Sequence, residues 1–157
     1  MADTLAPTDL AHLRRAIELS QLAREHGNHP FGALIVTADG RIIEAENTVI
    51  TDHDVTCHAE TNLVRFAGKE MDAADLPAST LFTSCEPCAM CCGAIFWVGI
   101  GRVVYALSGR ALIALAGSGD DLDLPSREVF ARGGRPTSVS GPHLEDEAAR
   151  AHEGFWG

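Results

Sequence analysis

The stretch Cys85-Glu86-Pro87-Cys88 is the part of the sequence around which the fold and the function are organised. Two thiolates at C-x-x-C spacing bind zinc when a further ligand comes from elsewhere in the chain. The upstream segment His58-Ala59-Glu60 offers such a ligand. We therefore predict a zinc site in which His58, Cys85 and Cys88 are the protein ligands.

The chemistry of such a site explains why these residue types occur together. One imidazole and two thiolates leave the fourth position of a tetrahedral zinc ion open for water, and the metal lowers the pKa of that water toward about 7. A carboxylate must then move the protons, and we assign this role to Glu60. Because residues two apart on a regular helix point to nearly opposite faces, His58 and Glu60 are predicted to lie at a helix start. A helix start also suits Cys85 and Cys88, since it lowers the pKa of a thiol.

Two further cysteines leave other kinds of metal site open. Cys91 extends the pattern to C-x-x-C-x-x-C, which is typical of iron–sulfur proteins. A non-enzymatic protein would use Cys85, Cys88, Cys91 and Cys92 together for a cluster or a closed zinc site. However, no Cys-Pro pair follows, and Cys91-Cys92 leads directly into the apolar segment 93–98. We therefore interpret Cys91 and Cys92 as small buried hydrophobic residues.

Length and composition indicate a single globular domain over residues 1–157. The net charge of −10 argues against extended contact with a phosphate backbone, and so against a nucleic-acid partner. Residues 1–8 have no feature of a secretory signal, and the longest apolar run, 89–100, is too short to span a bilayer, so no membrane partner is expected. The 5 cysteines, two of them adjacent, fit a reducing cytoplasm better than a disulfide framework.

Hydrophobic patterns along the chain predict alternating strands and helices. Helices are expected at 10–22, 58–67, 86–98, 126–131 and 144–152, and strands at 31–36, 41–45, 80–83, 102–106 and 137–140. The first two strands form a hairpin through the turn at 38–40. Segment 111–115 fits either a helix or a strand. Alternation after an initial hairpin predicts an α/β fold, namely a three-layer α/β/α domain with a mixed sheet.

With these elements placed, the sequence resembles the cytidine-deaminase-like superfamily, and within it the branch of guanine, cytosine and tRNA-adenosine deaminases. The matching stretches lie in the first two thirds of the chain: Pro30-Phe31-Gly32-Ala33, Asn47, His58-Ala59-Glu60, Thr83 to Cys91, and Gly93 to Trp97. The resemblance implies a five-stranded sheet between helices, Zn2+ as the cofactor, and a homodimer. By this resemblance His58, Cys85 and Cys88 bind the zinc ion and Glu60 moves the proton.

The resemblance also implies contacts to the substrate. The side chain of Asn47 and the backbone N–H of Ala59 would hold the ring edge of a base, and an Asn amide presents a donor and an acceptor for this purpose. Asn47 fits a local turn contact as well. Phe31 is expected either in the pocket wall or in the plain core.

The sequence leaves the substrate open between a guanine-type and a cytosine- or azacytosine-type base. Residues 84–88 followed by Phe96-Trp97 are most similar to guanine deaminases. Guanine deaminases of this branch carry a Gly-Phe-Asp-Glu-like segment after the fourth strand, which we do not find here. The closing Phe155-Trp156 is instead similar to the C-terminal aromatic cover of cytosine deaminases. We expect residues 141–157 to form a helix and an aromatic tail that either covers the site or completes the core.

The function that we infer is zinc-dependent hydrolytic deamination of a small-molecule nucleobase or a related amino-heterocycle, with water as the second substrate and ammonia as a product. A tRNA adenosine deaminase is the alternative that keeps the same chemistry. Against it stand the net charge and the acidic helix expected at 144–152. A non-enzymatic metal protein is the alternative from another class.

Overall fold

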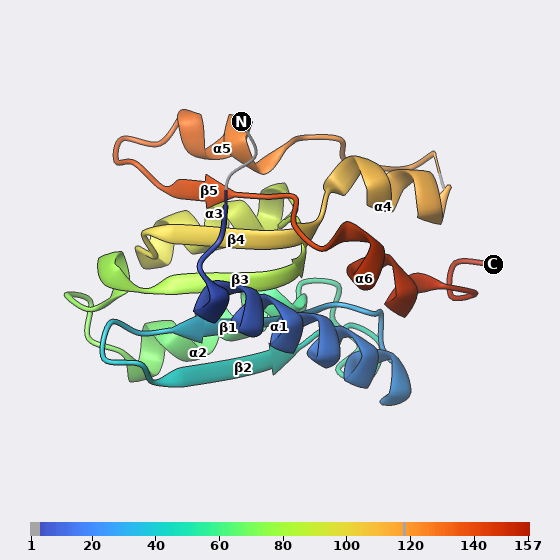
Figure 1. Cartoon of the computed structure of the whole chain (residues 1–157), viewed down its shortest axis with the longest axis horizontal. Coiled ribbons are helices and arrows are strands. Elements are labelled where there is room, and N and C mark those ends of the chain that lie inside the picture. The colour runs from blue at the N-terminus through green and yellow to red at the C-terminus, as the bar shows by residue number, and fades with distance from the viewer. Residues whose placement is uncertain (1–3, 118) are drawn as a thin grey trace.

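A computed structural model describes residues 4–117 and 119–157 of the chain. Within these ranges a five-stranded sheet lies between two layers of helices (Figure 1). The three-layer α/β/α fold predicted from the sequence is therefore confirmed. Residues 1–3, which belong to the predicted domain 1–157 and to the expectation about a secretory signal, lie outside the described residues.

The sheet is mixed, as predicted. Its strands are β1 (Gly32–Val36), β2 (Ile42–Glu46), β3 (Thr80–Cys85), β4 (Arg102–Leu107) and β5 (Ser138–Ser140), in the order β2-β1-β3-β4-β5. β1 pairs antiparallel with β2 and with β3, whereas β3, β4 and β5 run parallel to one another. The carboxyl ends of these three parallel strands therefore lie at the same end of the sheet, on the right in Figure 1.

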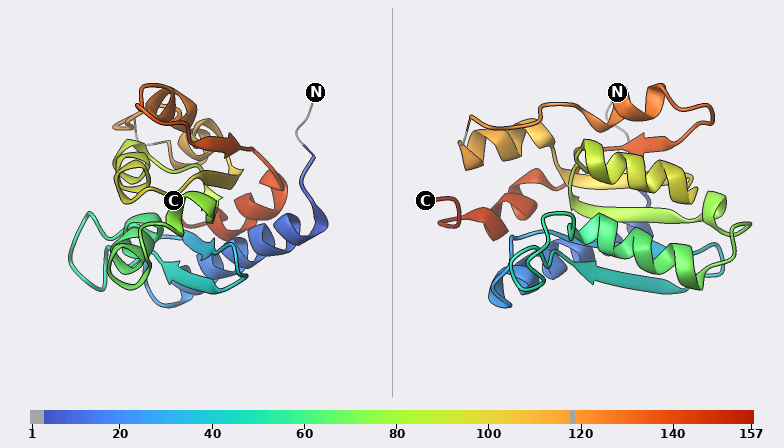
Figure 2. Two further views of the ribbon diagram at one scale, coloured as in Figure 1. Left: turned by 90° about the vertical axis from the view of Figure 1, so that its left-hand side faces the viewer. Right: turned by 180° about the vertical axis from the view of Figure 1, so that it is seen from behind.

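Helices cover both faces of the sheet. The described ranges contain α1 (Pro7–Glu25), α2 (Ala59–Glu70), α3 (Ala89–Val98), α4 (Gly109–Ala116), α5 (Ser126–Ala131) and α6 (Glu145–Ala149), with short 3-10 turns η1 (Leu76–Ala78) and η2 (Arg150–His152). Figure 2 shows α1 and α6 on one face, and α2 and α3 side by side on the other, with α5 next to α3. None of the helices in the described ranges has the length and apolar content that a membrane span requires.

Segment 111–115, which the sequence left open, is helical and belongs to α4. The Ser108 Oγ accepts a hydrogen bond from the Ala111 N–H at 3.2 Å and so caps the N-terminus of this helix. α3 begins at Ala89 and not at residue 86 as predicted, because residues 86–88 form the turn between β3 and the helix.

Apolar side chains fill the two spaces between the sheet and its helices. On the α1 face, Leu13, Ile17, Leu34, Phe82 and Val104 are among the buried residues. On the α2 and α3 face they include Ile35, Leu63, Leu81, Ile95 and Val103. Because successive strand residues point to opposite faces, neighbours such as Leu34 and Ile35 contribute to different cores.

Gly32 allows α1 to lie directly on the sheet. A Cβ atom at this position would stand 2.5 Å from the Leu19 Cβ and 2.6 Å from the Ser20 backbone nitrogen. Such separations are far inside van der Waals contact, so only glycine fits between the helix and β1. This close packing also fixes the backbone from which the preceding residue, Phe31, projects.

Candidate active site

Two helix N-termini meet beside the carboxyl end of β3. His58 is the residue directly before α2, in an extended conformation with φ −66° and ψ 158°. Cys88 holds the same position before α3, and Cys91 lies in the first turn of that helix. The free N–H groups of a helix start favour negative charge, such as that of a thiolate. The prediction that His58 and Glu60 lie at a helix start is confirmed, since Glu60 is in the first turn of α2.

Three donor atoms form a small triangle at this point. The Nδ1 of His58 lies 3.6 Å from the Sγ of Cys88 and 3.4 Å from the Sγ of Cys91, and the two sulfur atoms are 3.6 Å apart. At the usual bond lengths, ligands of one tetrahedral zinc ion are separated by about 3.6 Å from sulfur to nitrogen and about 3.8 Å from sulfur to sulfur. The triangle therefore has the size and the donor types of a zinc site.

The donor triangle differs from the predicted ligand set in one residue. Among the described residues, the group that could hold a metal ion consists of His58, Cys88 and Cys91, so that Cys91 takes the place of Cys85. Cys85 is the last residue of β3, and it packs into the apolar core between the sheet and α1. Geometry separates the two thiols, because burial contributes to a raised pKa for Cys85 and for Cys91 alike.

Glu60 lies beside the triangle and is almost inaccessible to solvent. The residue is 4% exposed, its Oε1 accepts a hydrogen bond from the Thr83 Oγ1 at 2.7 Å, and its Oε2 lies 3.6 Å from the Cys91 Sγ. Burial raises the pKa of Glu60, while the hydrogen bond from Thr83 opposes that shift. A carboxyl group in such a place can take up a proton and return it during a reaction.

The two thiols of the triangle differ in acidity. A hydrogen bond from Cys91, together with one from His58, lowers the pKa of Cys88 to about 4 in spite of burial. The same contact with Cys88, followed by burial, raises the pKa of Cys91. The hydrogen bond to Cys88 likewise raises the pKa of His58. A bound cation favours the deprotonated form of all three groups, so metal binding releases protons here.

Asn47 and Ala59 adjoin residues of the site: the Asn47 N–H donates to the Phe31 carbonyl at 3.0 Å, and Ala59 directly follows His58. Asn47 directly follows β2, is 1% exposed, and its Oδ1 accepts a hydrogen bond from the Val49 N–H at 3.0 Å. The local turn contact considered for Asn47 is therefore present. Ala59 is the buried first residue of α2, so its N–H has no acceptor within the helix.

A cavity of about 80 Å³ adjoins the triangle. Its lining residues are Phe31, His58, Glu60, Cys85, Glu86, Cys88 and Leu112. The side chain of Phe31 thus lies in the pocket wall, which was one of its two expected places.

The C-terminal tail packs against Phe31 from outside the cavity. The Nε1 of Trp156 donates to the Nδ1 of His152 at 3.0 Å, and the Trp156 ring lies 6.2 Å from the Phe31 ring and 5.7 Å from the His29 ring. The Phe155 ring lies 5.8 Å from that of His29. Burial lowers the pKa of His152 to about 4, so this ring is neutral at pH 7 and its Nδ1 can accept the indole N–H.

Arg24 of α1 fastens the same tail. Its guanidinium donates to the carbonyl oxygens of Ala151 and Glu153 at 3.0 Å and 2.6 Å, and lies 5.4 Å from the centre of the Phe155 ring. The tail therefore docks on its own chain, at the end of the molecule that carries the triangle (Figure 1).

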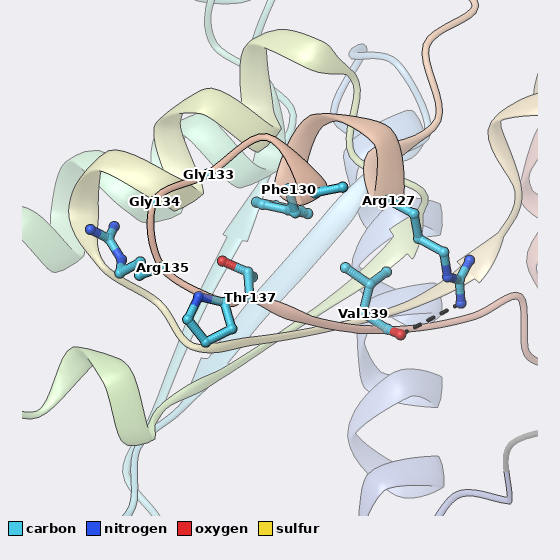
Figure 3. Close-up of a pocket in the computed structure, with 9 residues that line it drawn as sticks. Arg127, Phe130, Gly133, Gly134, Arg135, Thr137 and Val139 are labelled. Atoms are coloured by element: carbon cyan, nitrogen blue, oxygen red, sulfur yellow. Dashed lines mark hydrogen bonds between the residues drawn. The ribbon is translucent and has the colours of Figure 1, made fainter.

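A second hollow, of about 570 Å³, lies between α5 and β5 (Figure 3). It shares no lining residue with the cavity at the triangle. Its two arginines already have partners: Arg127 donates to the Tyr105 hydroxyl and the Gly141 carbonyl, both at 2.9 Å, and Arg135 lies 4.2 Å from the centre of the Phe96 ring. The hollow is wide, but the acid–base and thiol groups lie elsewhere, so we place the active site at the smaller cavity.

Comparison with known proteins assigns the chain to a family. The family model of the cytidine and deoxycytidylate deaminase zinc-binding region matches residues 7–107. The chain belongs to this deaminase family. The predicted membership of the cytidine-deaminase-like superfamily is confirmed, and the deaminase is accordingly a hydrolase of carbon–nitrogen bonds.

Relatives of this deaminase share most of its length or its fold. A probable cytosine deaminase of Schizosaccharomyces pombe is 46% identical over 155 residues, which cover 97% of this chain and 94% of that protein. A guanine deaminase of Bacillus subtilis is 44% identical over 95 residues, which cover 60% of this chain and 61% of that protein. The solved structure of a guanine deaminase from Nitrosomonas europaea matches with a TM-score of 0.77 at 25% identity, covering 97% of this chain and 86% of that one.

Zinc fits the donor set of this deaminase. The family model is that of a zinc-binding region, and the triangle offers one imidazole nitrogen and two sulfurs at tetrahedral spacing. We assign His58, Cys88 and Cys91 as the residues that would hold the ion. Three protein ligands leave one position open, as in catalytic rather than structural zinc sites.

Two overlapping C-x-x-C patterns account for the difference between the predicted ligand set and the donor triangle. Cys85 lies at the end of strand β3, whereas Cys88 directly precedes α3. Cys91 follows three residues later, in the first turn of that helix. Residues at that spacing lie on the same side of a helix. Pro87 was the available signal, because zinc deaminases carry the order P-C-x-x-C and this proline directly precedes Cys88.

Cys92 is buried, as predicted, and its Sγ donates to the Pro87 carbonyl at 3.3 Å. The four cysteines 85, 88, 91 and 92 are thus not gathered into one cluster in the part of the chain that the structure describes. This arrangement argues against the non-enzymatic cluster protein considered from the sequence.

Glu86 ties later parts of the deaminase to the turn that carries Cys88. Its carboxylate accepts hydrogen bonds from the Gly109 N–H at 2.9 Å, the Ser126 N–H at 2.9 Å and the Ser126 hydroxyl at 2.6 Å. Gly109 and Ser126 are the first residues of α4 and α5, so one negative charge faces two helix N-termini. This contact fixes the start of α4, whose Leu112 lines the cavity.

Replacing single cysteines tests the corrected ligand set. Cys91→Ala and Cys88→Ala should reduce bound zinc from about one ion per chain to near zero, because two remaining ligands hold the ion poorly. Cys85→Ala and Cys92→Ala should keep the full zinc content and lose only some stability from the smaller core side chain. Metal analysis of the purified variants decides the matter. Loss of zinc from Cys85→Ala, with full zinc in Cys91→Ala, would restore the original ligand set.

Proposed function

We propose that the protein hydrolyses the amino group of a free single-ring base, such as cytosine or the related triazine 5-azacytosine. The observation that carries this proposal is that Glu60 lines one cavity together with His58 and Cys88, two members of the donor triangle. The choice of a single-ring base is supported by the 46% identity to a probable cytosine deaminase, over 97% of this chain.

The reaction adds water to the ring carbon that bears the amino group and breaks the bond between that carbon and the amino nitrogen. The products are the oxo-base and ammonia. When bound, zinc supplies Lewis-acid activation of the attacking water. Thr83 holds the Oε1 of Glu60, which leaves the Oε2, facing Cys91, to receive the proton of the water. Glu60 then delivers protons to the neighbouring ring nitrogen and to the departing amine.

Asn47 and Ala59 are proposed to hold the ring edge of the base. The Asn47 Oδ1 is engaged with the Val49 N–H, so its orientation is fixed and the Nδ2 is the group available to a substrate acceptor. The Ala59 N–H adds a second donor at the start of α2. These two donors match the two lone pairs of the carbonyl oxygen of a cytosine-like base, and the ring nitrogen is left to Glu60.

Phe155 and Trp156 are proposed to close the cavity behind Phe31. They contact Phe31 and His29 and do not themselves line the closed cavity, so they act as a cover over its aromatic wall. Closure excludes water from the flat base and supports stacking on Phe31. This role places residues 141–157 in substrate binding as well as in folding.

A homodimer formed through α2 and α3 is also proposed. Trp97 is 82% exposed, Phe66 is 48% exposed and Met90 is 39% exposed, and all three lie on these two neighbouring helices. Large exposed apolar side chains on two neighbouring helices support an interaction surface, and a second copy of the chain is the partner that the family resemblance implies.

Ammonia release from a panel of bases tests the proposed activity. The zinc-loaded protein should deaminate cytosine and 5-azacytosine, and guanine and adenine far more slowly. Glu60→Gln should keep its zinc and its fold but lose activity by about 10²–10⁴-fold, because an amide cannot carry the proton. Activity on guanine alone would contradict the single-ring assignment. Silence on all bases, with inosine formed in tRNA, would favour the tRNA deaminase.

Removal of residues 154–157 tests the aromatic cover. The truncated protein should keep zinc and melt near the wild-type temperature, with KM raised about tenfold, since stacking contributes about 1–3 kcal/mol. Arg24→Met should act in the same direction, because it releases the tail without deleting an aromatic ring. A large fall in melting temperature with unchanged KM would show instead that the tail only completes the core.

Sedimentation tests the proposed dimer. Trp97→Asp should convert the wild-type dimer into a monomer at micromolar concentration, because a buried charge opposes association. Ile42→Asp, on the edge strand β2, is the matched control and should leave the dimer intact. A monomeric wild-type protein would rule out this assembly.

A further inference from the structure

Residues 48–57 connect two parts of the proposed site without forming a helix or a strand. Asn47 precedes this segment and His58 follows it. Most of the segment is exposed, including Ile50 at 50% and Val55 at 77%. The packing of α2 on β2 and the Asn47 N–H bond to the Phe31 carbonyl place the two ends in part, and hydrogen bonds of the exposed segment supply the rest.

One side chain of α2 joins both ends of this segment. The Nδ2 of Asn62 donates to the Glu46 carbonyl at 3.0 Å and to the Thr48 Oγ1 at 2.9 Å, the two residues on either side of Asn47. The same nitrogen lies 3.5 Å from the carbonyl of Cys57, the residue before His58. An amide has two N–H donors, so the two shorter contacts use both of them.

Asn62 is itself held firmly. Its backbone N–H donates to the His58 carbonyl at 2.9 Å, which places it one helical turn after the metal ligand. The Thr48 N–H also donates to the Cys57 carbonyl at 3.0 Å and closes the base of the segment. Residues 50 and 51 of the segment are held separately, because the Asn28 Oδ1 accepts hydrogen bonds from the N–H groups of Ile50 and Thr51 at 3.1 Å and 3.0 Å.

We propose that Asn62 is a positioning residue that sets the distance between Asn47 and the metal ligand His58. Its side chain donates hydrogen bonds to Glu46 and Thr48, which flank Asn47. These bonds link both residues to the first turn of α2, the helix that directly follows His58. The base contact and the metal centre then move as one unit. This inference rests on the proposed function, since it assigns Asn47 to the substrate.

Kinetics of Asn62→Ala test the proposal. The variant should keep about one zinc per chain, raise KM about tenfold or more, and change kcat less than KM, because the base contact loosens while Glu60 and the metal ligands stay in place. Arg65→Met is the matched control: it removes the guanidinium that donates to the Asn62 Oδ1 at 2.9 Å and leaves the Nδ2 contacts intact. Arg65→Met should keep the wild-type KM. An unchanged KM in Asn62→Ala, with a lower melting temperature, would reduce Asn62 to a structural role and overturn the proposal.

Thr48→Val is a milder second variant in case Asn62→Ala does not fold. It deletes one of the two acceptors and keeps the shape of the side chain, so a smaller rise in KM is expected. A wild-type KM in this variant would count against the proposal.

Amide hydrogen exchange provides a readout that needs no substrate. The Thr48 N–H and the Asp52 N–H, which donate to the Cys57 and Thr48 carbonyls, should exchange faster in Asn62→Ala and unchanged in Arg65→Met. If the wild-type protein deaminates no base, the proposed function fails, while exchange still shows whether Asn62 holds the segment. Wild-type exchange rates in Asn62→Ala would overturn the positioning role by themselves.

Discussion

The meeting of two helix N-termini is the constraint on which the site depends. His58 and Cys88 are the residues directly before α2 and α3, so both project from helix starts that face the same space. Neither side chain could reach the other if the two helices lay on opposite faces of the sheet. The parallel pairing of β3 with β4 and the side-by-side packing of α2 and α3 are therefore requirements of the metal triangle. The buried core on that face supports the chemistry as directly as it supports the fold.

The fold could be predicted from the sequence because its elements are strongly patterned. The strands observed at 32–36, 80–85 and 102–107 coincide with apolar runs that turns and glycines delimit. The segment at 111–115 could not be assigned from its pattern, since a short apolar run fits a helix as well as a strand. The Ser108 cap stabilises the helical conformation of this segment, and this contact can form only after the chain has turned at the end of β4.

The site was predicted in part. His58 and Glu60 belong to one short motif, and their place at a helix start follows from helical periodicity once both are assigned to one metal site. Cys91 was missed because spacing does not tell a pair on one helix from a pair that spans a strand end and a turn. Asn62 gave no signal at all: in sequence it is a polar residue on a helix, and its partners become neighbours only when the segment before His58 folds back.

The Glu86 carboxylate has a consequence for how this family can vary. It anchors the first residues of both α4 and α5, so the chain between residues 109 and 126 begins and ends beside the turn that carries Cys88. The entropic cost of closing such a loop grows only slowly with its length. Insertions there would therefore leave the zinc ligands and Glu60 where they are. They would remodel the surface next to Leu112 and so offer a place to adapt substrate range without rebuilding the reaction centre.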